Sequence, residues 1–337
     1  MNDLQPEALS LIFAYLPNLE DFVYCSLVCK VWAAAVLQAR PKRLRMPNLC
    51  FDCPYDSAAE LIGRLQVWQK RGGLQQLKHL LLQDIQENYG DEYQKGDPSF
   101  EFAEAVISLS MAWKLQTCEL QGPFCLTSAV GKLPESIRTL HLSPHAGPSE
   151  THLSNLSRLS ALRKLYLDIS ALDCEDCDSQ EWEYCAQFKH VKEGTKPQGP
   201  DTCDVLMDGR LDQLRSLTLK FPFCAKANPD CDLASLLPRL HYLDTFIRGD
   251  KQGMLAAQQM IVLPNLQKLC LQVSTDAMWS WHLEVPASAC LRKFCLKGPL
   301  CYNSPRLHVD ILKPGIGFEG SRVHKVFLLQ RHRRLCH

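Results

Sequence analysis

Residues 159–167 read Leu-Ser-Ala-Leu-Arg-Lys-Leu-Tyr-Leu, which is the spacing Leu-x-x-Leu-x-x-Leu-x-Leu. The same spacing returns without substitution at three other places, beginning at Leu74, Leu211 and Leu263. Leucine is also unusually abundant, at 54 of 337 residues. An excess of one apolar residue at a fixed spacing indicates internal repeats, each of which buries its apolar face against its neighbours. The sequence therefore predicts a repeat protein.

Less regular copies of the pattern lie between and beyond the complete ones, with a period of about 25 residues. One interval of 52 residues is twice 26, which predicts a hidden copy near Val191. The last two leucines of each copy alternate with a non-core residue, as the two faces of a β-strand require. Strands are expected at 41–47, 79–83, 117–121, 139–143, 164–168, 216–220, 242–246, 268–272, 293–297 and 325–329.

Helices are expected in the segments that return from one strand to the next. Residues 57–60, Ser-Ala-Ala-Glu, form a capping box that opens one helix, and Gly72 and Gly73 end it. A second helix is predicted to begin with Asp97 as N-cap and Pro98 in its first turn. The repeating unit is therefore a helix followed by a strand.

The first 40 residues follow a different pattern, typical of a small helical unit. A helix is predicted to open at Pro6 and to end at Pro17. Asp21 and Phe22 lead into a second helix, and Val28, Trp32 and Val36 form an i, i+4, i+8 stripe on a third.

Two resemblances follow from these patterns. Leu4-Gln5-Pro6-Glu7-Ala8-Leu9, Ile12-Phe13, Leu16, Asp21-Phe22 and Val28-Cys29-Lys30-x-Trp32 resemble an F-box in order and spacing, over about residues 3–45. One departure is Gln5, which stands where the usual proline follows Leu4. The repeat spacing is similar to that of leucine-rich repeats.

The resemblances imply an α/β protein with two parts. These are a three-helix F-box at 1–45 and a short, irregular leucine-rich-repeat solenoid of about 9–10 repeats at 46–337. An acidic, Cys-containing stretch at about 172–208 is expected to be an insertion or a degenerate repeat.

The function implied by resemblance is that of F-box/leucine-rich-repeat proteins, the substrate receptors of SCF-type cullin-RING ubiquitin ligases. The F-box would bind a Skp-type adaptor, and through it the cullin-RING ligase, while the repeats bind an unknown protein substrate. The alternative is a leucine-rich-repeat interaction scaffold or receptor without ligase function, and help from a small molecule in recognition stays open. Candidate adaptor-binding residues are Leu4, Pro6, Leu9, Ile12, Phe13, Leu16, Val28 and Trp32.

Some of these residues are also needed for the core of so small a helical unit. We expect Phe13 and Trp32 to be core or mixed, and Leu4, Pro6 and Leu9 to be contact residues.

Substrate binding is expected on the strand face whose side chains alternate with the buried leucines, the concave face of a solenoid. Lysines outnumber acids there, which most often indicates an ordinary solvated sheet face; the alternative is recognition of an acidic or phosphorylated segment with aromatic anchors. Candidate substrate-binding residues are Lys164, Tyr166, Lys220, Tyr242, Phe246, Lys268, Lys293 and Lys297.

The 17 cysteines are interpreted as reduced thiols of a cytoplasmic or nuclear protein. Cys174-x-x-Cys177, with Cys185, His190 and Cys203 downstream, has the ligand types for zinc, although free thiols in a loop explain the pattern as well. No cofactor or metal is expected.

Composition excludes several other classes of protein. Thirty-seven Lys and Arg balance 37 Asp and Glu, which argues against non-specific nucleic-acid binding. The longest apolar run, residues 31–37, is far shorter than the roughly 18 residues of a membrane helix. No phosphate-binding glycine loop or hydrolase motif occurs, so we expect a non-enzyme.

Overall fold

The computed structural model has an α/β architecture with parallel strands. The chain divides into two compact units, Met1–Leu162 and Arg163–His337, and each is described by itself. The structure describes residues 4–46, 58–83, 98–121, 131–143, 153–168, 211–223, 233–247, 251–273, 281–286, 288–297, 307–311, 317–321 and 326–330.

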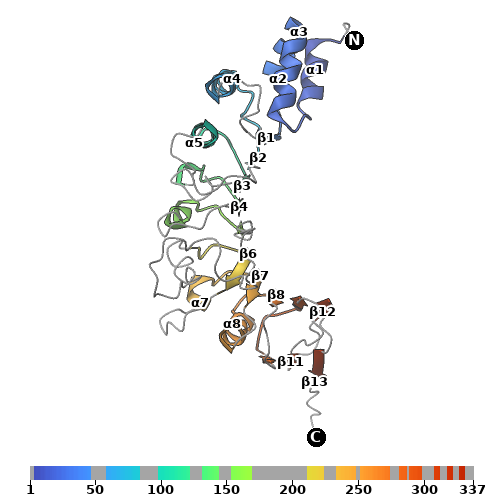
Figure 1. Ribbon diagram of the computed structural model, residues 1–337, viewed down its shortest axis with the longest axis vertical. Coiled ribbons are helices and arrows are strands. Elements are labelled where there is room, and N and C mark those ends of the chain that lie inside the picture. Colours follow the sequence, from blue (N-terminus) through green and yellow to red (C-terminus); the bar gives the residue numbers. More distant parts are fainter. Residues whose placement is uncertain are drawn as a thin grey trace, which may run out of the picture. The chain divides into compact units, whose positions relative to one another are not determined.

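Three helices open the first unit, as the sequence predicts (Figure 1). They are α1 (Pro6–Phe13), α2 (Leu19–Val28) and α3 (Lys30–Gln38). Pro6 stands in the first turn of α1, where its missing N–H has no intrahelical partner to lose. The shared core of the three helices is formed by Leu9, Phe13, Leu19, Phe22, Val23, Ala35 and Val36.

Four parallel strands follow one another in the same unit: β1 (Arg43–Arg45), β2 (His79–Gln83), β3 (Thr117–Gln121) and β4 (Thr139–Ser143). Their pairing aligns the predicted core positions in one buried row, Leu44, Leu80, Cys118 and Leu140. The strands predicted from the leucine spacing are confirmed, including the one in 41–47.

The return segments of this unit are α4 (Ala58–Lys70), α5 (Pro98–Ser110) and a 3-10 helix, η3 (Leu153–Arg158). In Figure 1, α4 and α5 lie to one side of the strands. Both predicted helices are confirmed. The chain leaves α4 through Gly72, whose φ of 74° favours glycine. A Cβ on Gly73 would lie 1.9 Å from the Trp68 indole, so only glycine fits there.

The second unit continues the strand pattern with β5 (Lys164–Leu167), β6 (Ser216–Phe223), β7 (Tyr242–Ile247), β8 (Lys268–Val273), β10 (Lys293–Lys297) and β12 (Gly317–Ser321). These strands pair in that order and all run parallel. Two helices stand in the return segments, α7 (Leu233–Leu236) and α8 (Lys251–Ile261). The core row of this unit is Leu165, Leu217, Leu243, Leu269 and Phe294.

The hidden repeat predicted near Val191 does not supply a strand between β5 and β6. Lys164 pairs directly with Ser216, and the N–H groups of Arg215 and Ser216 both donate to the Arg163 carbonyl at 2.8 and 3.0 Å. Two strands that share hydrogen bonds leave no place for a third between them. The residues of the doubled interval therefore supply no strand between β5 and β6, and residues 169–210 lie outside the described part of the chain.

The pairing of the strands after β8 also differs from the prediction. A second parallel sheet contains β9 (Trp281–Val285), β11 (Leu307–Ile311) and β13 (Val326–Gln330), in the order β13-β11-β9. The strand predicted at 325–329 exists as β13, but it pairs with β11 and does not follow β10. Its place beside β10 is taken by β12, where Phe318 pairs with Phe294. A search for leucines misses β12 because Phe318 and Gly320 stand at the positions that pair with Phe294 and Leu296.

A repeated backbone contact fixes the N-terminal edge of the strands. The carbonyl of the residue before a strand accepts two hydrogen bonds, from the residue before the next strand and from the first residue of that strand. The Lys42 carbonyl accepts in this way from Lys78 and His79 at 2.9 and 3.0 Å. In the second unit the carbonyls of Arg163, Arg215, His241 and Gln267 repeat this contact. Residues at the start of successive strands are therefore held in register.

Candidate protein-binding surfaces

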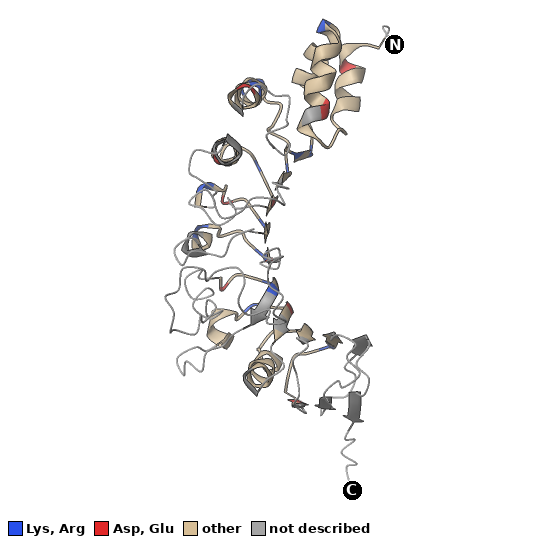
Figure 2. Cartoon of the chain, in the orientation of Figure 1, with Lys and Arg blue, Asp and Glu red and all other residues tan. Residues whose placement is uncertain are grey.

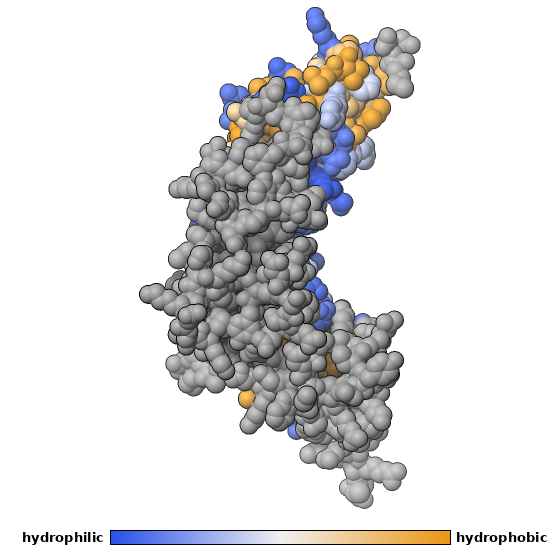
Figure 3. Space-filling view, viewed as in Figure 1, coloured by the Kyte–Doolittle hydropathy of each residue, from blue (hydrophilic) through white to orange (hydrophobic). Residues whose placement is uncertain are grey.

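Large apolar side chains are exposed on the three N-terminal helices. Leu27 and Val28 at the end of α2 are 66% and 61% exposed, and Ile12 at the end of α1 is 52% exposed. Figure 3 shows hydrophobic residues gathered over this part of the first unit. We name this set the helical apolar surface: Leu4, Leu11, Ile12, Tyr15, Tyr24, Leu27, Val28 and Val31.

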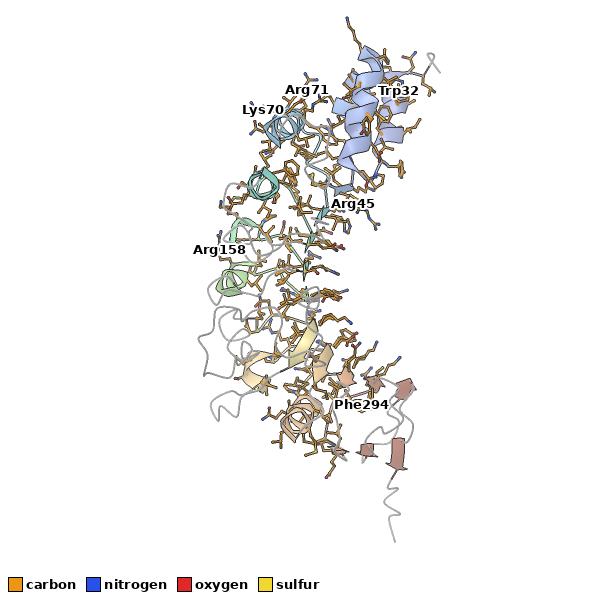
Figure 4. All side chains as sticks on the ribbon, in the orientation of Figure 1. Trp32, Arg45, Lys70, Arg71, Arg158 and Phe294 are labelled. Carbon is orange, nitrogen blue, oxygen red and sulfur yellow. The ribbon has the colours of Figure 1, made fainter. Side chains whose placement is uncertain are left out.

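Three of the predicted adaptor-binding residues, Leu4, Ile12 and Val28, belong to this surface. Pro6, Leu16 and Trp32 are partly buried. Trp32, labelled in Figure 4, packs against Phe13 with ring centroids 5.2 Å apart. Phe13 is buried and Trp32 is partly buried, as expected of core or mixed residues.

The prediction that Leu9 is a contact residue is wrong. Leu9 is only 3% exposed. Leu9 and Phe13 lie four residues apart and so share the face of α1 that packs into the helical core. Leu9 is therefore a core residue of this unit.

The sequence interpretation also missed five members of the helical apolar surface. Tyr24, Leu27 and Val28 follow one another at i, i+3 and i+4 on α2, an apolar stripe that the predicted core did not use, and Val31 lies beyond Cys29 on α3. An apolar stripe with no partner inside the unit is a readable signal for a binding surface. The missed residues are Leu11, Tyr15, Tyr24, Leu27 and Val31.

The second unit presents a strand face with paired tyrosines and aspartates. Tyr166 on β5 donates its hydroxyl to Asp168 at 2.9 Å, and Tyr242 on β7 donates to Asp244 at 3.1 Å. Each aspartate lies two residues after its tyrosine, Asp244 within β7 and Asp168 directly after β5, so both side chains of a pair stand on the same face. Burial, together with the hydrogen bond to Asp168, raises the pKa of Tyr166 to about 12.

Lysines join this face at its N-terminal side. Tyr242, Lys268 and Lys293 are paired across β7, β8 and β10, so they stand in one row. The Lys268 ammonium lies 4.9 Å from the centroid of the Tyr242 ring, a cation–π contact. Lys164 on β5 pairs with Ser216, which pairs with Tyr242, and therefore belongs to the same row.

The register at the C-terminal end of this face is interrupted. The pairing of β6 with β7 shifts between Leu219 and Pro222, so Phe246 pairs with Pro222. A continuous register would pair Phe246 with Lys220, and the irregularity displaces the partner by two residues. Lys297 ends β10 and pairs with Gln272.

Two thiols form part of the same face. Cys270 pairs with Asp244 on one side and with Cys295 on the other, and both cysteines are buried. Burial raises the pKa of Cys270 to about 11, and Cys295 and Asp244 act in the same direction. A thiol that stays protonated at neutral pH is a poor nucleophile.

The predicted zinc ligands Cys174, Cys177, Cys185, His190 and Cys203 lie outside the described residues. Within the described ranges there is no group of three or more His, Cys, Asp or Glu side chains placed to hold a metal ion.

Comparison of the sequence with protein-family models and with curated proteins gives no match. None of the helices that the structure describes combines the length and the apolarity needed to cross a membrane.

Proposed function

We propose that the protein is the substrate receptor of an SCF-type cullin-RING ubiquitin ligase. The three N-terminal helices act as an F-box that binds a Skp-type adaptor, and the leucine-rich repeats bind the protein substrate. The observation that carries the proposal is the helical apolar surface, which leaves Leu27, Val28 and Ile12 in water.

Burying this surface against a partner would be strongly favourable. Full burial of one large apolar side chain contributes about 1.5–3 kcal/mol, and several such residues gathered on one small unit are typical of a protein interface. The helices have already filled their own core with Leu9, Phe13 and Phe22, so the exposed residues are surplus to folding.

The attachment of the helices to the first repeat also supports the proposal. The Arg45 N–H donates to the Pro17 carbonyl at 2.7 Å, and Arg64 donates to Ser26 at 3.4 Å. The Arg40 guanidinium donates to the Arg71 carbonyl at 3.2 Å. These bonds join the helices to β1 and α4, so a partner on the helices is held in a defined position relative to the first repeats.

The test is co-expression with a Skp-type adaptor, comparing the wild type with the double variant Leu27→Glu/Val28→Glu. We expect the variant to lose adaptor capture while its melting temperature is unchanged, because both side chains are exposed in the free chain. The matched control is Leu255→Glu, an equally apolar residue of α8 that is 53% exposed in the other unit.

Adaptor capture by the double variant at wild-type level would contradict the proposal. A ligase receptor should recover the cullin together with the adaptor. A scaffold without ligase function should recover the adaptor alone or neither protein.

A further inference from the structure

A row of basic residues marks the N-terminal edge of the strands in the second unit. We define the strand-start row as the residue before each strand and the first residue of that strand, for β5, β6, β7, β8 and β10. Its members are Arg163-Lys164, Arg215-Ser216, His241-Tyr242, Gln267-Lys268 and Arg292-Lys293. Six of these ten residues are Lys or Arg and none is Asp or Glu, in a chain whose total charge is zero. Blue segments recur along these strands in Figure 2.

Backbone hydrogen bonds hold this row in place. The Arg215 carbonyl accepts from His241 and Tyr242 at 2.9 and 3.1 Å, and the Gln267 carbonyl accepts from Arg292 and Lys293 at 2.8 and 2.9 Å. Successive members therefore lie one strand spacing apart, about 4.8 Å. Five strands extend the row over about 19 Å, the length of about six residues of extended peptide.

Three of the six cations in the row are open to a ligand. Lys164, Arg215 and Arg292 are exposed, and among the described residues none of them has an ion pair. The carboxylates on the neighbouring strand face, Asp168 and Asp244, accept the tyrosine hydroxyls.

We propose that the strand-start row binds an extended acidic or phosphorylated peptide segment of a partner protein, which crosses the strands. This names the substrate class of the proposed receptor and rests on that function for its biological role. Guanidinium groups suit the ligand because they bind carboxylate and phosphate oxygens through paired hydrogen bonds. Fixed spacing adds specificity, because alternate side chains of an extended peptide point the same way.

Single-stranded nucleic acid is the less favoured polyanion. Such ligands need open aromatic faces for base stacking as well as cations. The ring of Tyr242 is already covered on one side by Lys268. The remainder of the chain also supplies no excess positive charge.

The experiment is fluorescence anisotropy with the full chain and labelled probes of about twelve residues, a length that covers the row. The probes are a Glu-rich peptide, the same sequence with phosphoserine at the Glu positions, the same sequence with Gln, and a single-stranded RNA. We expect both anionic peptides to bind, the Gln peptide and the RNA to bind at least tenfold more weakly, and affinity to fall steeply as salt rises.

The test variant is Arg215→Gln/Lys268→Gln/Arg292→Gln. Its matched control, Lys70→Gln/Lys114→Gln/Lys132→Gln, removes the same charge from exposed positions of the first unit. The test variant should lose at least tenfold in peptide affinity with an unchanged melting temperature, while the control variant binds as the wild type does.

Equal losses in both variants, unchanged binding in the test variant, absence of peptide binding, or tighter binding of the RNA would each overturn the inference. Adaptor capture is measured on the same samples. If the peptide binds but the adaptor does not, the proposed function is contradicted and peptide binding by the strand-start row is supported. If the adaptor binds but the peptide does not, only the inference about the strand-start row is contradicted.

Discussion

Phe22 of α2 packs against Trp68 of α4, with ring centroids 4.7 Å apart and the ring planes tilted by 50°. The Trp68 indole also donates to the Ala39 carbonyl at 3.3 Å. Both rings are buried, so this pair fastens the N-terminal helices to the first repeat. The helices and the repeats of the first unit are therefore expected to unfold together.

Replacing Trp68 tests this coupling. Trp68→Ala should lower the free energy of unfolding by about 3–5 kcal/mol, because it removes a large buried ring together with its hydrogen bond to the Ala39 carbonyl. Urea denaturation measures the loss. In a double-mutant cycle with Phe22→Ala, we expect a coupling of about 0.5–1.5 kcal/mol, and purely additive effects would contradict the ring contact.

Two glycines near α4 should respond to the same substitution in opposite directions. Gly73→Ala places a methyl group 1.9 Å from Trp68, so it should destabilise the chain by about 1–3 kcal/mol. Gly63 lies within α4, and a methyl group added there would have no neighbouring atom within 4 Å, so Gly63→Ala should stabilise by about 0.5–1 kcal/mol. Thermal melting of the two variants gives the signs, and equal signs would show that the path of the chain around Trp68 is wrong.

Leu217 tests the repeat register in the second unit. It is fully buried on β6 between Leu165 and Leu243, so Leu217→Ala should lower stability by about 2–5 kcal/mol. Leu255→Ala makes the same truncation at an exposed site and should change stability by less than about 0.5 kcal/mol. Denaturant midpoints of the two variants make the comparison, and similar losses would argue against the register.

Thiol reactivity should follow burial. Cys118 and Cys270 are buried and their pKa values are raised by burial, so few of these thiols are ionised at pH 8. Cys29 and Cys290 are exposed. With iodoacetamide at pH 8, mass spectrometry should find Cys29 and Cys290 alkylated first, and Cys118 and Cys270 only after urea is added. Early alkylation of Cys270 would contradict its position on the strand face.

Alkaline pH should lower the free energy of unfolding of the second unit. Because burial and Asp168 raise the pKa of Tyr166 to about 12, against about 10 in an unfolded chain, the unfolded state loses this proton first. The contribution of Tyr166 to stability is therefore constant below about pH 10 and declines as the pH rises towards 12. Tyr166→Phe should make the loss of stability between pH 9 and pH 11 smaller, as measured by urea denaturation; an unchanged loss would exclude Tyr166 as a source.

The period of the repeats could be predicted from the sequence because the residues that define it are close together in the chain. Leu162, Leu165 and Leu167 show the turn and the alternating strand by themselves, and the same spacing predicted the strands from β2 to β8. Where leucine is replaced, as at Phe318 and Gly320, the local pattern disappears although the strand remains.

Local spacing thus determined the strands from β2 to β8, the helices α4 and α5, and which leucines of the repeats are buried. Tertiary structure alone decided that β5 joins β6 across a long connection, that β13 pairs with β11, and that Leu9 is core while Leu27 is exposed. It also aligned residues such as Arg215 and Arg292, far apart in sequence, along one edge of the strands. The physical reason is that backbone geometry sets the spacing at which the side chains of one helix or strand point the same way. Whether such a side chain is buried, and what it contacts, depends on the distant elements that pack against it.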